Sequence, residues 1–342
     1  MQRARQLAPI ILAAAACASL AAPALSRAER TRQQPINVPR QPAETSSQTA
    51  GTASELPRPD APRPRLEFLG DWGTHGEGPA NLDLAVAMAS DALGNIYIAD
   101  AGSGFIHKFT PSGHPLLAFD DPRLSNPVAI AVDSDGDIYA ADGRSGRVLV
   151  FSALGDPDHE QHAGGLVRFR APSALALDVD ENLYVADTAL AAVAKYDNRG
   201  RFVRIVTRGN VGAVRVHTPM ALVAALDGSL FIADGSSGLI SHFSPQGDLI
   251  GTLGQPGAPV RTRNPVSLAV SGKFLFCFDA APPRLLAWTL DGKPYFEQDL
   301  SARIALLKGN ADTRASVAFV PPDFVLVLDP SSGKVLRFRA VF

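Results

Sequence analysis

The chain has 342 residues, of which 46% are hydrophobic and 19% are charged, so it has enough apolar side chains to build a folded core. Its 32 Lys and Arg residues are nearly balanced by 34 Asp and Glu residues, which argues against binding of nucleic acid or an anionic membrane through overall charge. The 29 glycines and 27 prolines predict many turns, as in an all-β protein.

Residues 1–26 have the order of a secretory signal peptide. Two arginines precede an apolar stretch that runs from Leu7 to Leu25, and Ala24 and Ser26 offer the small residues that a signal peptidase reads. The sequence therefore predicts export to the periplasm or the extracellular space.

Cys17 allows a second interpretation, in which the same segment is a bacterial lipoprotein signal and the cysteine carries a lipid. An uncleaved anchor is a third alternative. The lipid on Cys17 is the one membrane contact that we expect of the mature protein. Cys277 is the only other cysteine, so plain cleavage would leave no pair for an internal disulfide.

Residues 27–65 contain seven prolines, and Gln, Ser, Thr and Ala fill most of the rest. Such a composition cannot bury enough apolar surface to offset the entropy lost on ordering, and proline keeps the chain extended. We expect a disordered linker, which could also let a lipid-anchored protein reach across an envelope layer. The folded domain is expected over residues 66–342.

Six repeats dominate the rest of the sequence. Each has a hydrophobic run that ends in Asp, an aromatic residue nine positions later and, in the first five copies, a glycine thirteen positions later. The six runs are residues 95–100, 137–142, 182–187, 229–234, 274–279 and 324–329.

Each repeat predicts four short strands separated by turns, and no stretch after the signal shows sustained helical periodicity. The fold class that this pattern predicts is all-β: a six-bladed β-propeller of four-stranded antiparallel blades. The chain stops after the third strand of the last repeat, whereas Leu66–Leu69 resembles an orphan fourth strand. We therefore expect this N-terminal strand to close the last blade and remove two exposed edges.

The repeats resemble those of the NHL-repeat β-propeller family. The resemblance covers about residues 66–342 and rests on runs such as Gly94–Asp100, on the aromatic and glycine offsets, and on entry segments such as Asn264–Val270. Phe278 and Leu328 depart from the pattern, because other copies have a small residue before the Asp. The resemblance implies a propeller that binds protein, RNA or sugar, or that occasionally catalyses a reaction.

Most of the chemically capable residues are expected to be structural. The repeated Asp residues should accept backbone N–H groups of the following turn, the aromatic residues should pack between blades, and Cys277 should be a buried, inert thiol. The seven histidines show one closely spaced pair, His159 and His162, and no third ligand at zinc spacing. We therefore predict no catalytic residue, no metal site and no cofactor.

The loops that enter the first strands of repeats three to six are strongly basic. With Lys308, they hold nine basic residues against one acid, Asp312. Other parts of the predicted rim are acidic and hold Asp71, Glu77, Asp83, Asp120, Asp121, Asp156, Asp158 and Glu160. The predicted partner-binding residues are Arg168, Arg170, Arg208, Arg215, Arg261, Arg263, Arg303 and Arg314.

These observations predict a non-catalytic binding or scaffolding module of the cell envelope. It would engage a protein, or another anionic ligand, through the basic loops, because arginine clamps carboxylate and phosphate groups. Export makes a nucleic-acid partner an unfavoured alternative. A second alternative is an envelope enzyme of lyase or lactonase type with a metal site at the channel mouth.

Overall fold

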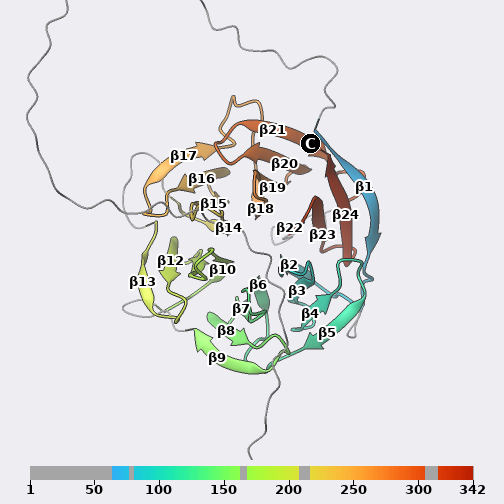
Figure 1. The fold of residues 1–342 in the computed structure, drawn as a ribbon, viewed down its shortest axis with the longest axis vertical. Helices are drawn as coiled ribbons and strands as arrows, with labels where there is room; N and C mark the ends of the chain where they lie inside the picture. The colour runs from blue at the N-terminus through green and yellow to red at the C-terminus, as the bar shows by residue number, and fades with distance from the viewer. Residues whose placement is uncertain (1–63, 77–80, 162–167, 208–215, 305–314, 342) are drawn as a thin grey trace, which may run out of the picture. The chain divides into compact units, whose positions relative to one another are not determined.

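The computed structural model describes residues 64–76, 81–161, 168–207, 216–304 and 315–341, and these residues form six four-stranded antiparallel sheets arranged in a ring (Figure 1). This confirms the predicted all-β, six-bladed propeller. Among the described residues, no helix is long and apolar enough to cross a membrane. The predicted signal peptide at 1–26 and all of the predicted linker except its last two residues lie outside the described residues, so these two boundaries stay predictions.

The blades follow one another along the chain, and each runs outward from the channel. Blade 1 contains β2 (Ala85–Ser90), β3 (Ile96–Asp100), β4 (Ile106–Phe109) and β5 (Pro115–Phe119). Blade 2 contains β6 (Pro127–Val132), β7 (Ile138–Asp142), β8 (Arg147–Phe151) and β9 (Pro157–Gln161). Blade 3 contains β10 (Pro172–Leu177), β11 (Leu183–Asp187), β12 (Ala192–Tyr196) and β13 (Phe202–Ile205).

Blade 4 contains β14 (Pro219–Ala224), β15 (Leu230–Asp234), β16 (Leu239–Phe243) and β17 (Leu249–Leu253). Blade 5 contains β18 (Pro265–Val270), β19 (Phe274–Ala280), β20 (Pro283–Thr289) and β21 (Pro294–Asp299). Blade 6 combines β22 (Ser316–Val320), β23 (Phe324–Asp329) and β24 (Lys334–Val341) with the N-terminal strand β1 (Arg65–Trp72).

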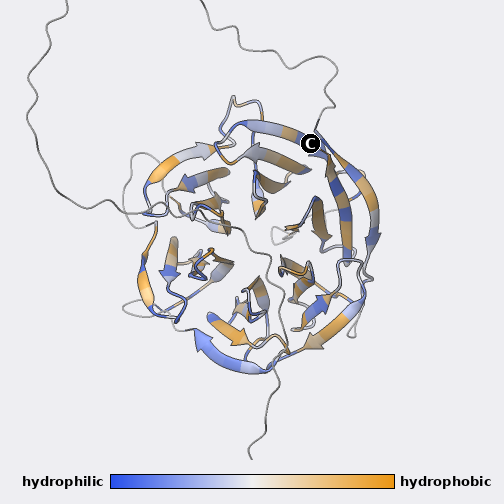
Figure 2. Cartoon of the chain, in the orientation of Figure 1, coloured by the Kyte–Doolittle hydropathy of each residue, from blue (hydrophilic) through white to orange (hydrophobic). Residues whose placement is uncertain are grey.

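Burial falls from the middle strands of each blade to its outer strand. The second strands are buried almost throughout, whereas outer strands such as β9 are largely exposed. Figure 2 shows this contrast in blade 2, where β8 is hydrophobic and β9 is hydrophilic. Apolar side chains on both faces of the middle strands pack against neighbouring blades, and this burial is the main favourable term in folding.

The repeated aromatic and glycine residues have the structural roles predicted for them. Each aromatic residue lies within a third strand, is at most 6% exposed and belongs to a core cluster. The five glycines adopt φ between +71° and +89°, which L-residues with a Cβ rarely adopt. At Gly113 a Cβ would also lie 2.4 Å from Cγ of Trp72, so this turn needs glycine for space as well as for conformation.

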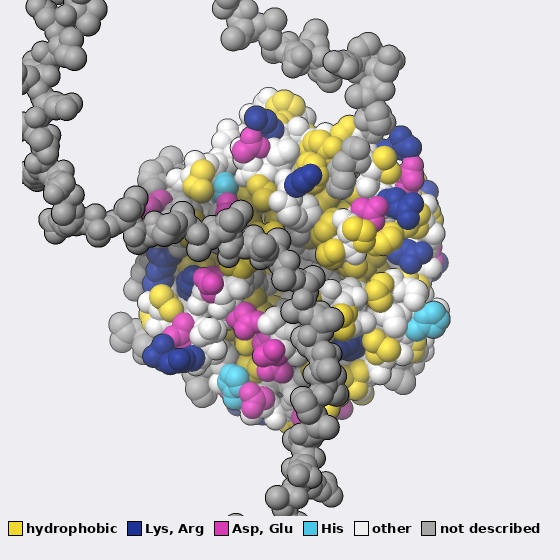
Figure 3. All heavy atoms as spheres, viewed as in Figure 1, with side chains coloured by type: hydrophobic (Ala, Val, Ile, Leu, Met, Phe, Trp, Pro, Cys, Tyr) yellow, Lys and Arg dark blue, Asp and Glu magenta, His cyan; other side chains and the backbone are white. Residues whose placement is uncertain are grey.

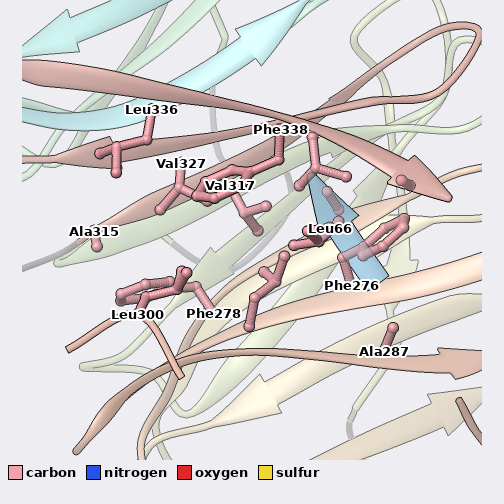
Figure 4. Close-up of a cluster of buried hydrophobic side chains, with 14 of the residues drawn as sticks. Leu66, Phe276, Phe278, Ala287, Leu300, Ala315, Val317, Val327, Leu336 and Phe338 are labelled. Carbon is pink, nitrogen blue, oxygen red and sulfur yellow. The ribbon is translucent and has the colours of Figure 1, made fainter. Parts of the chain in front are cut away.

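Blade 6 is closed by the N-terminal strand, as predicted. Strand β1 pairs antiparallel with β24, from Arg65 opposite Val341 to Trp72 opposite Val335, so it is longer than the predicted Leu66–Leu69. A bulge lies between Phe68 and Gly70. Figure 4 shows Leu66 among the buried side chains of blades 5 and 6, next to Phe338. The pairing removes the open edge that blade 6 would otherwise expose.

Candidate functional site

Two faces of the ring differ in their loops. We call one the entry face: it carries the loops that lead into the first strand of each blade and the turns between second and third strands. The opposite face carries the turns between first and second strands and between third and fourth strands. The described residues among the predicted basic set belong to the entry face.

The repeated Asp residues organise the entry face. Asp100 is fully buried, and its carboxylate accepts hydrogen bonds from the backbone N–H of Asp83 (2.7 Å), Leu84 (2.8 Å) and Gly102 (3.0 Å). Burial alone would raise the pKa of Asp100, but the His107 imidazole, 3.7 Å away, and the backbone hydrogen bonds lower it overall. The bond to its own turn confirms the prediction. The bonds to the entry loop were missed, because that loop lies about sixteen residues earlier in the chain.

The same arrangement positions predicted arginines. The backbone N–H of Arg170 donates to Asp187 Oδ2 at 2.7 Å, and that of Arg263 donates to Asp279 Oδ2 at 3.0 Å. A largely buried arginine, Arg284, supports the second loop, since its guanidinium bonds both Asp279 and the backbone carbonyl of Arg261 (3.0 Å). The backbone at Arg170 and Arg263 is therefore fixed by buried carboxylates.

Five of the predicted binding residues lie among the described residues, and all five are exposed on the entry face: Arg168, Arg170, Arg261, Arg263 and Arg303. None of their guanidinium groups forms an ion pair with another described residue. The other three, Arg208, Arg215 and Arg314, lie outside the described residues. The fold thus brings basic side chains from blades 3 and 5 and from the loop after β21 onto one face, where their charges add.

The acidic part of the same rim is weaker than the sequence suggested. Asp121 is 8% exposed and pairs with Arg123 at 2.7 Å, and Asp71 pairs with Lys334 at 3.1 Å. Asp156, which was expected on this rim, belongs instead to the turn between β8 and β9 on the opposite face. Asp158 and Glu160 lie within strand β9. That prediction was wrong because the fourth strand of blade 2 begins two residues after Gly155, the same offset as in the other blades with this glycine, so residues 155–161 form a turn and a strand and not an entry loop.

The opposite face has the reverse charge. Acidic side chains gather there over the blades that contain β6 and β10 in Figure 3. Across the described turns between first and second strands, nine acids face one base, Lys273. These acids are Asp91, Asp133, Asp135, Asp137, Asp178, Asp180, Glu181, Asp227 and Asp323.

In three of the turns on the opposite face, a tyrosine hydroxyl donates a hydrogen bond to the Asp that begins the turn. Tyr184 donates to Asp178 at 3.1 Å, and Lys195 pairs with the same carboxylate at 3.1 Å. In blade 2, burial and the nearby charges of Asp137 and Glu181 raise the pKa of Asp133. In each of these three blades the Asp stands five residues before the second strand, so the sequence carries a signal for this turn.

The channel through the ring is apolar. Its two cavities have volumes of about 80 and 220 Å³ and are lined by Ala, Val, Leu, Ile, Met, Phe and Ser residues of the first strands. Three of the serines tie neighbouring blades together. Ser173 donates to the carbonyl of Pro219 (2.6 Å), whereas Ser267 and Ser316 accept the N–H of Val317 (2.9 Å) and Met88 (3.1 Å). Within the described channel, no titratable side chain is available for acid–base chemistry.

The described histidines are spread over several blades, and Cys277 lies in strand β19. His107 and His242 lie in third strands, but His159 lies in strand β9 and not in a loop; His162 is outside the described residues. The described residues contain no group of three His, Cys, Asp or Glu side chains that could hold a metal ion. Cys277 is fully buried, and burial raises the pKa of its thiol well above the usual value, as expected for an inert residue.

Comparisons with known proteins agree with this architecture. The model of the NHL repeat family matches residues 124–151, which extend from the entry loop of blade 2 to the end of its third strand. No curated protein sequence matches the chain.

Solved structures of two kinds are similar. Virginiamycin B lyase from Staphylococcus aureus superposes with a TM-score of 0.57 at 12% identity, over 82% of this chain and all of that chain. U3-55K superposes with a TM-score of 0.53 at 16% identity, over 78% of this chain and 77% of that chain. The WD40 repeats of RRP9 superpose with a TM-score of 0.55 at 16% identity, over 77% of this chain and 78% of that chain. At these identities the likeness concerns the fold alone. The chain is therefore a six-bladed β-propeller that contains an NHL repeat.

Proposed function

We propose that this propeller is a non-catalytic binding or scaffolding module of the cell envelope, which engages a protein partner through its basic entry face. The observation that supports the proposal is that five arginines are exposed there without an ion pair to any described residue. An arginine whose planar donors are unpaired is suited to bidentate recognition of carboxylates. Export, which residues 1–26 predict, would place the partner in the envelope.

The charge asymmetry of the two faces gives the partner an orientation. An acidic partner is attracted to the entry face and repelled by the acidic turns opposite, so encounters are steered toward one side of the ring. Because buried Asp carboxylates hold the backbone at Arg170 and Arg263, these two positions are ordered before binding, which lowers the entropy lost on association.

The test is a variant with Arg168, Arg170, Arg261 and Arg263 all changed to Ser. These side chains make no ion pair with a described residue, so the variant should melt like the wild type. The variant should no longer capture protein from an envelope extract at low salt. Capture by the wild type should weaken as added salt screens the charges.

The matched control removes four basic residues from the opposite face: Arg199, Arg201, Lys273 and Lys293, each changed to Ser. It alters the net charge by the same amount and should keep the same partners. Equal capture by both variants, with the same salt dependence, would contradict the proposal and direct attention to the channel mouth or a blade edge.

The alternative function is an envelope enzyme of lyase or lactonase type with a metal site at the channel mouth. Its support is the similar fold of virginiamycin B lyase. The described channel lining is apolar and offers no carboxylate or imidazole, so such an enzyme would have to draw its reactive groups from elsewhere on the entry face. The binding function therefore remains the one that we propose.

A further inference from the structure

A groove of about 450 Å³ lies on the entry face where blade 5 meets the strand that closes the ring. We call it the seam groove. Its walls are the loop after β21, the turn between β23 and β24, and strand β1, so it exists only because the N-terminal strand completes blade 6. Phe68 and Leu336 supply an apolar wall, and Arg303 and Lys334 supply two positive charges.

Arg303 is held in a defined orientation within this groove. Its guanidinium carbon lies 3.9 Å from the centre of the Phe68 ring, and Phe68 itself is 36% exposed. Stacking uses the face of the guanidinium and leaves its N–H donors, which lie in the plane, for other partners. No described residue pairs with this charge. The arrangement offers an oriented donor set beside an aromatic surface.

Lys334 is the second donor, and it has a weak partner. Its Nζ lies 3.1 Å from Asp71 Oδ1, but both side chains are well exposed, at 47% and 38%. Exposed pairs of this kind contribute little to stability and rearrange readily. The other acid of the groove, Asp329, is buried and accepts hydrogen bonds from the hydroxyl groups of Ser331 (2.6 Å) and Ser332 (2.7 Å) in its own turn.

We propose that the seam groove binds a carboxylate that stands next to an apolar side chain, as at the C-terminus of a peptide. The carboxylate would accept hydrogen bonds from Arg303 and bridge to Lys334, and the apolar side chain would pack against Phe68. This inference rests on the function proposed above, since it names the chemical group that one of the entry-face arginines recognises. A free carboxylate fits better than an extended acidic stretch, because the remaining charged groups of the groove are Asp71 and Asp329.

The probe is a fluorescein-labelled peptide, Gly-Gly-Ala-Leu, prepared as the free acid and as the C-terminal amide, and binding is followed by fluorescence anisotropy on the full chain. The free acid should bind more tightly than the amide. Arg303→Gln should weaken binding of the acid by about tenfold or more, because a charge-assisted hydrogen bond is lost. Asp71→Asn should strengthen it, because Lys334 is released from its competing partner.

The control is Arg144→Gln, which removes an exposed arginine of the turn between β7 and β8, on the same face but outside the groove, and which should bind the acid like the wild type. Thermal melting establishes that each variant is folded. Equal binding of acid and amide, or equal weakening by Arg303→Gln and Arg144→Gln, would overturn the proposal, as would no binding at all. If the peptide fails while the four-arginine variant still loses its partner, the seam groove is wrong and the basic entry face stands. If the peptide binds as expected while the four-arginine variant keeps its partner, the seam groove stands and the basic entry face is wrong.

Discussion

Leu66 should be the residue through which the N-terminal strand closes the ring. It is 6% exposed and packs in the cluster shared by blades 5 and 6, whereas Leu69, three residues later on the same strand, is 37% exposed and lies at the bulge without a register partner. Replacing a buried Leu by Ala costs about 2–5 kcal/mol, since the lost transfer energy adds to the cavity that remains. Changing an exposed Leu to Ala usually alters the free energy of unfolding by no more than about 0.5 kcal/mol.

These magnitudes predict a clear difference in melting temperature. Taking about 3 kcal/mol for Leu66→Ala, and about 2–3 °C per kcal/mol for a domain of this size, the midpoint should fall by about 6–9 °C. Leu69→Ala should shift it by no more than about 1–2 °C. Differential scanning calorimetry of the two variants beside the wild type measures both. Equal midpoints for the two variants would refute the conclusion that β1 is an integral strand of blade 6.

Three further predictions concern the linker, the Asp residues and acid stability. Deleting residues 27–60 should leave the melting temperature unchanged, whereas deletion through residue 72 should lower it sharply; equal values would contradict closure by β1. Asp187→Ala should destabilise the fold by about 2–4 kcal/mol in urea titration, because the backbone N–H groups of Arg170, Ala171 and Leu190 lose their acceptor; a loss below about 0.5 kcal/mol would show that the entry loop does not depend on it. Burial lowers the pKa of His242, against the attraction of Asp227, so the unfolded chain takes up this proton first and stability is lost as pH falls below about 6.5. Between pH 7.5 and 5 the wild type should therefore lose more stability than His242→Gln, and parallel curves would count against this assignment.

A fourth prediction concerns metal content. Because no complete ligand set is present among the described residues, elemental analysis of the purified domain should find zinc and calcium well below one ion per chain. A tightly held ion at about one per chain would favour the enzyme alternative over the binding function.

Much of the fold followed from local sequence patterns. The repeated Asp, aromatic and glycine positions predicted six blades, because each marks a feature of one blade: a buried acceptor, a packed side chain and a turn with positive φ. The closing strand was also predictable, since a missing fourth strand at one end and an unassigned strand at the other have one economical solution. Its longer extent, Arg65–Trp72, was not, because strand ends depend on the partner strand.

The candidate site depended far more on tertiary structure. The sequence located the basic loops, but it could not show that Asp187 and Asp279 hold Arg170 and Arg263 in place, because these bonds join residues about sixteen positions apart. It also placed Asp156 on the wrong face. The seam groove was out of reach altogether, since Phe68 and Arg303 are 235 residues apart and meet only when the ring closes. Short-range patterns determine which strands form; the contacts between distant loops, and so the chemistry of the face they build, are decided by closure of the ring.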